Sequence, residues 1–262
     1  MDNRTYLNGN FDQNNSTAVK LNYQLKEISG IAFSEKGNLF AHNDEIGIVY
    51  QIDAYSGKII KAFQLGKLVL ETDFEDLAIA NNKFYLITSN GKLYEFIEGN
   101  DDDKVYFKEI DLDFPSKNEI EGLCYDVTTN ALIIACKNSS GKNYKDQRPI
   151  YTFNLSTNKL DINPRFLISL IELNNKFGIK DFFPSAIALE PKTGNFFILS
   201  SKGKPAIVEI DSVGTIVDAN TLSKKAHPQP EGLAFNNNGD MIISDEADGN
   251  FATLTIYKYR KK

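Results

Sequence analysis

A short apolar pattern recurs five times along the chain, and this repeat constrains the fold more than any other feature. The gaps between successive copies are 46, 46, 64 and 46 residues, and an insertion explains the single long gap. The copies are ISGIAF from Ile28, FEDLAI from Phe74, IEGLCY from Ile120, PSAIAL from Pro184 and PEGLAF from Pro230.

Each copy is followed by the signals of further strands. A turn rich in Gly, Asn or Asp comes first, as at 34–38 and 236–240, and a second apolar strand follows it. A third strand of alternating character comes next, and most units contain a fourth, as at 58–65 and 104–112. Four antiparallel strands in a unit of this length are typical of a propeller blade. The sequence therefore predicts an all-β fold, a five-bladed β-propeller with four-stranded antiparallel blades.

The last unit is too short to supply all four strands. A spare apolar segment, AVKLNYQL at about 18–25, precedes the first copy. We expect it to form the outer strand of the final blade, because closing the ring removes open sheet edges. This gives an N-terminal tail at 1–17 and a single propeller domain at 18–262. The alternative is that 18–25 belongs to a frayed terminus.

The extra residues fall in the third unit, at about 139–183. A polar loop at 139–148 lengthens one hairpin. The segment 162–183 carries apolar residues at helical spacing, including Phe166, Leu167, Leu170 and Ile171, which predicts a short helix. A functional loop and a surface elaboration remain equally open interpretations of this insertion.

Composition excludes some functions. The net charge is −6 and no long basic run is present, so nucleic-acid binding is disfavoured. No apolar stretch approaches the roughly 20 residues of a transmembrane helix, and the polar start has no apolar signal core. Cys124 should face about position 133 across its hairpin, which places it out of register with Cys136. We therefore expect two free, buried cysteines.

The inner strands are expected to bring acidic side chains to the axis. If Leu77, Leu123 and Leu233 pack between blades, the glutamates two residues before them face the channel: Glu75, Glu121 and Glu231. Two residues earlier stand Glu27, Asp73, Glu119 and Gln229. Crowded carboxylates either take up protons or bind a cation, and Ca²⁺ suits a site of six to eight oxygens. The alternative is a polar channel with protonated or lysine-paired acids, for which the candidate cations are Lys26, Lys137 and Lys202.

A second polar cluster stands where the second strands end. It contains His42, Asn43, Asp44 and Glu45 in the first unit and Ser244, Asp245 and Glu246 in the last. Ring closure would place these two units side by side, near the channel acids. We therefore predict a ligand-binding rim formed by Asn43, Asp44, Asp245 and Glu246 with Glu27, Asp73 and Glu119. Ordinary turn chemistry is the alternative explanation.

No catalytic set is identified in the sequence. The only histidines are His42 and His227, and no G-x-S-x-G segment is present. Ser29 and Ser185 occupy the column of channel glutamates, but nothing marks either as activated. Two histidines and two out-of-register cysteines do not favour zinc. Whether the protein is an enzyme stays open.

The repeated E-G-L and the terminal S-D-E resemble the SdiA-regulated family of bacterial proteins. The resemblance runs from about Glu27 to Tyr259 and is carried by EISGIAF, DFEDLAI, NEIEGLCYD, FFPSAIALEPKTGNFFILSS and PQPEGLAFNNNGDMIISDE. It implies a propeller that is periplasmic, secreted or attached to the cell surface, without an assigned activity. The chain is more distantly similar to phytase-like and esterase-like propellers, which bind calcium near the axis. That similarity implies metal-binding roles for Glu75, Glu121 and Glu231.

Two functions are compatible with these observations. The first is a binding propeller, expected to be monomeric, with Ca²⁺ on its axis and a small molecule or a cell-envelope component at one face. The second is a calcium-dependent hydrolase of a phosphoester or a lactone. Ser29 and Ser185 replace glutamate in two units, and the dense charged set that a phytase needs is missing, which disfavours phytase activity.

Overall fold

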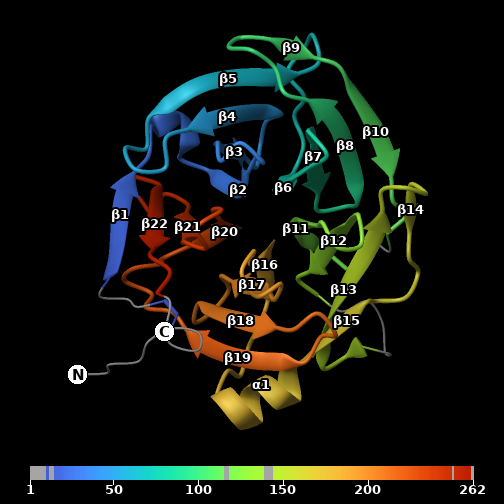
Figure 1. Ribbon diagram of the computed structural model, residues 1–262, viewed down its shortest axis with the longest axis vertical. Helices are drawn as coiled ribbons and strands as arrows, with labels where there is room; N and C mark the ends of the chain where they lie inside the picture. Colours follow the sequence, from blue (N-terminus) through green and yellow to red (C-terminus); the bar gives the residue numbers. More distant parts are fainter. Residues whose placement is uncertain (1–9, 12–14, 115–117, 139–143, 250, 261–262) are drawn as a thin grey trace.

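Five β-sheets surround a central axis (Figure 1), which confirms the predicted all-β propeller. The computed structural model describes residues 10–11, 15–114, 118–138, 144–249 and 251–260. The five copies of the sequence repeat form the strands nearest the axis. These inner strands are β2 (Ile28–Phe33), β6 (Phe74–Ala80), β11 (Ile120–Asp126), β16 (Pro184–Leu189) and β20 (Pro230–Phe235).

The next two strands of each blade follow outward in chain order. The second strands are β3 (Leu39–Asn43), β7 (Lys83–Thr88), β12 (Ala131–Cys136), β17 (Phe196–Ser200) and β21 (Met241–Asp245). The third strands are β4 (Ile48–Ile52), β8 (Lys92–Ile97), β13 (Gln147–Asn154), β18 (Ala206–Ile210) and β22 (Thr253–Tyr257). Every turn between a first and a second strand contains a glycine or an asparagine with positive φ, which suits the tight hairpins predicted there.

The outer strands differ more between blades. They are β5 (Ile59–Leu65), β10 (Phe107–Asp111), the pair β14 (Lys159–Leu160) and β15 (Phe166–Ser169), and β19 (Ile216–Thr221). The segment expected to be one strand at 104–112 is divided between two blades. Its first part, β9 (Lys104–Val105), pairs in parallel with β5 of the first blade, whereas β10 pairs with β8 of the second.

The ring closes with an N-terminal strand, as predicted. Strand β1 (Ser16–Lys20) pairs antiparallel with β22 at the edge of the last blade (Figure 1). The strand begins and ends earlier than the expected 18–25. The helix η2 (Tyr23–Leu25) follows it, because the Asn22 side chain accepts a hydrogen bond of 3.0 Å from the Gln24 amide and caps the turn.

The insertion in the third blade contains both a strand and a helix. The helix α1 (Leu170–Phe177) begins after Ser169, whose hydroxyl accepts from the Glu172 amide, and lies outside β19 (Figure 1). Of the apolar residues expected in a helix, Phe166 and Leu167 belong to β15 instead. They pair with the first half of β13, whose second half pairs with β14. Because the edge of β13 offers them backbone hydrogen bonds, Phe166 and Leu167 extend the sheet and the helix begins after them. Residues 139–143 of the polar loop lie outside the described residues.

Five apolar clusters fill the spaces between neighbouring blades. Leu77, Leu123 and Leu233 each belong to one of these clusters, as the sequence analysis assumed. Cys124 faces Ile133 across its hairpin, and both cysteines are free and buried, which confirms their predicted register. Within the described residues, no helix has the length and apolar character needed to cross a bilayer.

The N-terminal segment contributes to the core as well as to the sheet. The Phe11 ring is 1% exposed and lies about 6 Å from the rings of Phe197, Phe235 and Tyr259, between the fourth and fifth blades. We expect Phe11→Ala to lower the free energy of unfolding by about 3–5 kcal/mol, because it leaves a cavity. Phe251→Ala, at a ring that is 52% exposed, is the matched control and should cost less than about 1 kcal/mol. Chemical denaturation measures both, and equal losses would contradict the anchoring role of Phe11.

Candidate functional site

The site begins with the close approach of the five inner strands to one another. The third position of each repeat is Gly30, Asp76, Gly122, Ala186 or Gly232. A Cβ atom on Gly30 would collide with Asp76, and one on Gly122 would lie 3.0 Å from the Ala186 backbone. Equivalent positions therefore meet around the axis, which means that the inner strands run in the same direction.

Hydrogen bonds join these inner strands across the blades. The Ser29 hydroxyl donates to the Glu75 carbonyl, and the Ser185 hydroxyl donates to the Pro230 carbonyl at 3.0 Å. Asp76, which is buried, accepts the amide of Leu123 from the next blade at 2.6 Å. The two serines that replace glutamate in the column of channel acids thus join neighbouring blades, and neither hydroxyl is hydrogen-bonded to a catalytic base.

The shared direction of the inner strands gathers the predicted acids at one end of the channel. We call this end the acidic face. It carries the residues predicted as metal or ligand contacts, namely Glu27, Asn43, Asp44, Asp73, Glu75, Glu119, Glu121, Glu231, Asp245 and Glu246. Several of these acids are close enough to interact electrostatically, since Glu121, Asp73 and Glu231 all repel the charged form of Glu75.

Glu75 and Glu121 form a proton-sharing pair. Burial, followed by repulsion from Glu121, raises the pKa of Glu75 to about 10, so Glu75 carries the proton at neutral pH. Its side chain is hydrogen-bonded to Glu121. Lys137 places its Nζ 2.6 Å from Oε1 of Glu121 and 3.6 Å from Oε1 of Glu119. One proton and one ammonium therefore offset the two carboxyl groups of the Glu75–Glu121 pair, and Glu119 adds a further negative charge.

Glu27 and Glu246 repeat the arrangement between the first and the last blade. Burial, then a hydrogen bond with Glu27, raises the pKa of Glu246 to about 8. The hydrogen bond from Glu246 and the ion pair with Lys26, at 2.9 Å, lower the pKa of Glu27. Of the three lysines proposed to pair with acids, Lys26 and Lys137 do so. Lys202 instead lies 4.8 Å from the centre of the Phe183 ring.

Two more acids of this face have raised pKa values. Burial, then repulsion from Glu121, raises the pKa of Glu231 to about 8. Burial, then repulsion from Glu27, raises the pKa of Asp44 to about 6. Asp44 also lines a cleft of about 550 Å³ with Glu45, Ile46, Glu71, Thr72 and Asp73. The face therefore holds more carboxyl groups than its lysines neutralise.

The two histidines are buried in structural roles. His42 accepts the Gly30 amide on Nε2 at 3.0 Å, and its Nδ1 lies 2.8 Å from the Asn43 carbonyl. Burial lowers the pKa of His42 to about 4, so its ring is neutral. His227 lies between Asp245, 2.7 Å from Nδ1, and the Tyr257 hydroxyl, 2.5 Å from Nε2. Neither ring is exposed, so neither serves as an accessible general base.

The donor set of the acidic face suits a hard cation only in part. Among the described residues, no three Asp, Glu, His or Cys side chains already stand close enough together to hold a metal ion. The buried oxygens that have no hydrogen-bond donor within the described part of the chain nevertheless include Oδ1 of Asn43, of Asp44 and of Asp245. Unpaired oxygen acceptors beside carboxyl groups are the ligand type that Ca²⁺ prefers.

Sequence reasoning missed several residues of this site. Asp76 joins two blades, and its signal was an acidic side chain at a repeat position that is otherwise Gly or Ala. Glu71 lines the acidic cleft and Ser201 hydrogen-bonds to Glu231, but no pattern in the sequence marked either residue as part of the site.

The sequence profile of one family, described as SdiA-regulated, matches residues 12–254. The chain belongs to the SdiA-regulated family. The comparison with curated proteins finds no match to the sequence.

Solved structures resemble this SdiA-regulated protein in fold. A glutaminyl cyclase from Myxococcus xanthus is 13% identical, with a TM-score of 0.62 over 92% of this chain and 94% of the other. A luciferin-regenerating enzyme is 9% identical, with a TM-score of 0.57 over 93% and 95%. The PQQ-bound aldose sugar dehydrogenase from Streptomyces coelicolor is 10% identical, with a TM-score of 0.53 over 92% and 98%. At these identities the likeness shows the propeller fold alone.

The raised pKa values predict how stability depends on pH. The folded state retains protons on Glu75, Glu231 and Glu246 that the unfolded chain loses above its ordinary value of 4.5. Their contribution to the free energy of unfolding is therefore largest below that pH. It is lost as the pH rises through about 8 for Glu231 and Glu246, and through about 10 for Glu75. Without divalent cations, Glu231→Gln should gain about 1–3 kcal/mol relative to the wild type between about pH 5.5 and pH 8.5.

Denaturation in chelator at the two pH values measures this difference. Glu98→Gln is the control, because Glu98 follows the end of β8, is not part of the acidic face and pairs with Lys61 at 2.6 Å. The control should show the same difference from the wild type at both pH values. A Glu231→Gln difference that does not change with pH would contradict a protonated Glu231.

Proposed function

We propose that this propeller is a binding protein that holds a divalent cation, Ca²⁺, on its acidic face and takes a small molecule or a cell-envelope component there. The observation that carries the proposal is proton sharing: Glu75 with Glu121 and Glu246 with Glu27. Each pair retains a proton at neutral pH because its single lysine offsets only one of its two carboxyl charges. A divalent cation supplies the missing positive charge.

The unpaired oxygens of Asn43, Asp44 and Asp245 support the same proposal. A buried oxygen acceptor without a donor costs free energy, and a bound cation removes that cost. Ca²⁺ takes six to eight oxygen ligands in flexible geometry, which suits a face built from several loops and strand ends. Glu75, Glu121 and Glu231 are the proposed metal contacts. Glu27, Asp73 and Glu119 are proposed to contact the ligand, with Asn43, Asp44, Asp245 and Glu246.

Cation binding should release protons. Because Glu75, with a pKa of about 10, is protonated at neutral pH, Ca²⁺ must displace that proton to use its oxygens. We expect Ca²⁺ to raise the melting temperature and to bind about tenfold more tightly per pH unit for each proton released. Calorimetry in buffers of different ionisation enthalpy counts the protons. Equal melting temperatures in Ca²⁺ and in chelator would contradict the proposal.

Two substitutions are expected to change the Ca²⁺ affinity in opposite directions. Glu231→Gln removes a proposed oxygen ligand and should weaken Ca²⁺ binding by about tenfold or more. Lys137→Met removes an ammonium that competes for Glu121 and should tighten binding by a similar factor. Glu98→Gln is again the control and should leave the affinity unchanged. Unchanged affinity in both test variants would place any bound cation elsewhere.

Enzymatic activity is the competing outcome of the same experiments. The purified protein with Ca²⁺ is incubated with phosphomonoester, phosphodiester and lactone substrates. A binding protein turns over none of them. Turnover that disappears in Glu121→Gln and Glu231→Gln but persists in Glu98→Gln would replace the binding function with a calcium-dependent hydrolase.

We also propose that the protein is exported, which rests on the family resemblance. The tagged full-length protein should be found in the periplasm, at the cell surface or in the medium when bacterial cells are fractionated. Recovery with cytosolic marker enzymes alone would contradict this location.

A further inference from the structure

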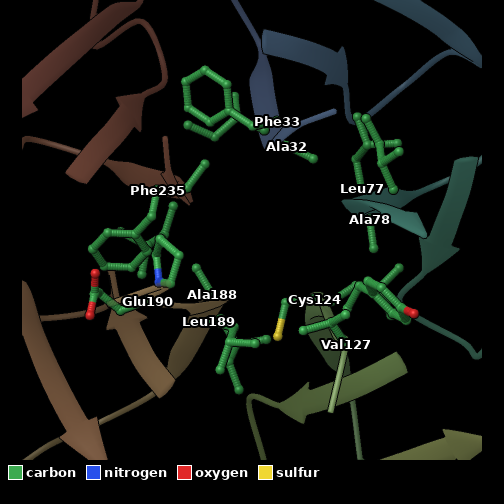
Figure 2. A pocket seen from close by; sticks show the side chains of 18 of the residues that line it. Ala32, Phe33, Leu77, Ala78, Cys124, Val127, Ala188, Leu189, Glu190 and Phe235 are labelled. Atoms are coloured by element: carbon green, nitrogen blue, oxygen red, sulfur yellow. The ribbon is translucent and has the colours of Figure 1, made fainter. Parts of the chain in front are cut away.

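The end of the channel opposite the acidic face is apolar. The fifth position of every repeat carries a small side chain: Ala32, Ala78, Cys124, Ala188 and Ala234. These residues line a cavity of about 410 Å³, which we call the apolar cup. Figure 2 shows labelled side chains from all five blades arranged around it. Because no repeat places a large side chain at this position, the space on the axis is left open.

The wall of the apolar cup is hydrophobic. Phe33, Ile79, Tyr125 and Leu189 follow the small residues along their strands and remain partly exposed there. Burial raises the pKa of the Cys124 thiol, so this sulfur is neutral. No lysine, arginine or histidine is among the described residues that line the cup.

The charged side chains of the lining, among the residues that the structure describes, are both acidic. Glu190 is buried, and its carboxylate accepts hydrogen bonds from the Lys192 and Thr193 amides, so its charge is already satisfied. Glu35 lies at the exposed turn beyond β2. An anionic ligand would meet these carboxylates without a compensating cation.

We propose that the apolar cup is a second binding site, for an uncharged and largely apolar small molecule. The volume falls within the roughly 300–1,000 Å³ typical of small-molecule pockets. Burying the partly exposed side chains of the wall supplies the free energy of binding. The site is separate from the acidic face and does not depend on a cation.

A small molecule suits the apolar cup better than a protein surface does. The turn residues around the cup include Ser34, Glu35, Thr128 and Asn237, whereas Val127, 66% exposed, is a lone large apolar side chain among them. A protein partner needs a wide contact surface of about 800 Å² on each side. The apolar area here is instead concentrated inside a concave pocket on the axis (Figure 2).

Fluorescent probes test the proposal with the full chain. The uncharged dye N-phenyl-1-naphthylamine should bind with micromolar affinity, equally in Ca²⁺ and in chelator. The anionic dye 1-anilinonaphthalene-8-sulfonate should bind at least about tenfold more weakly, because the cup offers no cation. Independence from Ca²⁺ separates this test from that of the acidic face, so either proposal can fail alone.

Two variants locate the bound dye. Ala188→Leu fills part of the cup and should weaken binding of the uncharged dye by about tenfold or more. Val127→Asp adds a charge at an exposed rim position, where folding is not at risk, and should weaken it several-fold. Val213→Phe, at a side chain that is 77% exposed in an outer turn, is the control and should bind as the wild type does. Circular dichroism verifies that each variant is folded. If Ala188→Leu does not fold, the result for Val127→Asp alone decides whether the dye binds in the cup.

The proposal is overturned if the uncharged dye does not bind at about 100 μM, or if Val127→Asp and a folded Ala188→Leu retain wild-type affinity. Equal binding of the anionic dye overturns the uncharged class of ligand. Concentration-dependent self-association that excludes the dye, measured by sedimentation velocity, would make the cup an interface between two copies of the chain.

Discussion

The structure depends on how closely the five inner strands approach one another around the axis. Small residues at the third position of the repeats, such as Gly30 and Gly122, allow backbone to meet backbone. Hydrogen bonds from Ser29 and Ser185, and to Asp76, then join neighbouring blades. Because equivalent positions meet, each step along the repeat becomes a ring of similar side chains. This geometry turns a weak linear repeat into two chemically distinct ends of one channel.

At the acidic end, burial opposes ionisation, and the fold does not supply enough positive charge to offset it. Lys137 neutralises Glu121, but Glu75 beside it is held protonated. Between the first and last blades, Lys26 likewise pairs with Glu27, and Glu246 beside it is held protonated. A protein can retain such unfavourable groups when a ligand removes their cost, because binding then couples directly to stability and to pH. This is the physical basis of the proposed cation site.

The other end of the channel is apolar and open rather than acidic and crowded. Small apolar side chains such as Ala78 and Ala188 leave space that larger ones would fill, and the lining includes no positive charge among the described residues. One propeller thus presents an acidic face and an apolar cup that would select ligands of different chemistry. Fold similarity to propeller enzymes does not distinguish these possibilities, because similar scaffolds carry unrelated sites.

The sequence alone determined the blade count, the order of strands within each blade, closure by an N-terminal strand and the free cysteines, because spacing and strand alternation are local properties. It also identified the channel glutamates, since the repeat aligns them. Only the tertiary structure decided which acids share protons, that Lys202 contacts Phe183 rather than a carboxylate, and that Asp76 joins two blades. It alone revealed the apolar cup. These outcomes depend on distances and burial between residues far apart in the chain, which a one-dimensional pattern does not contain.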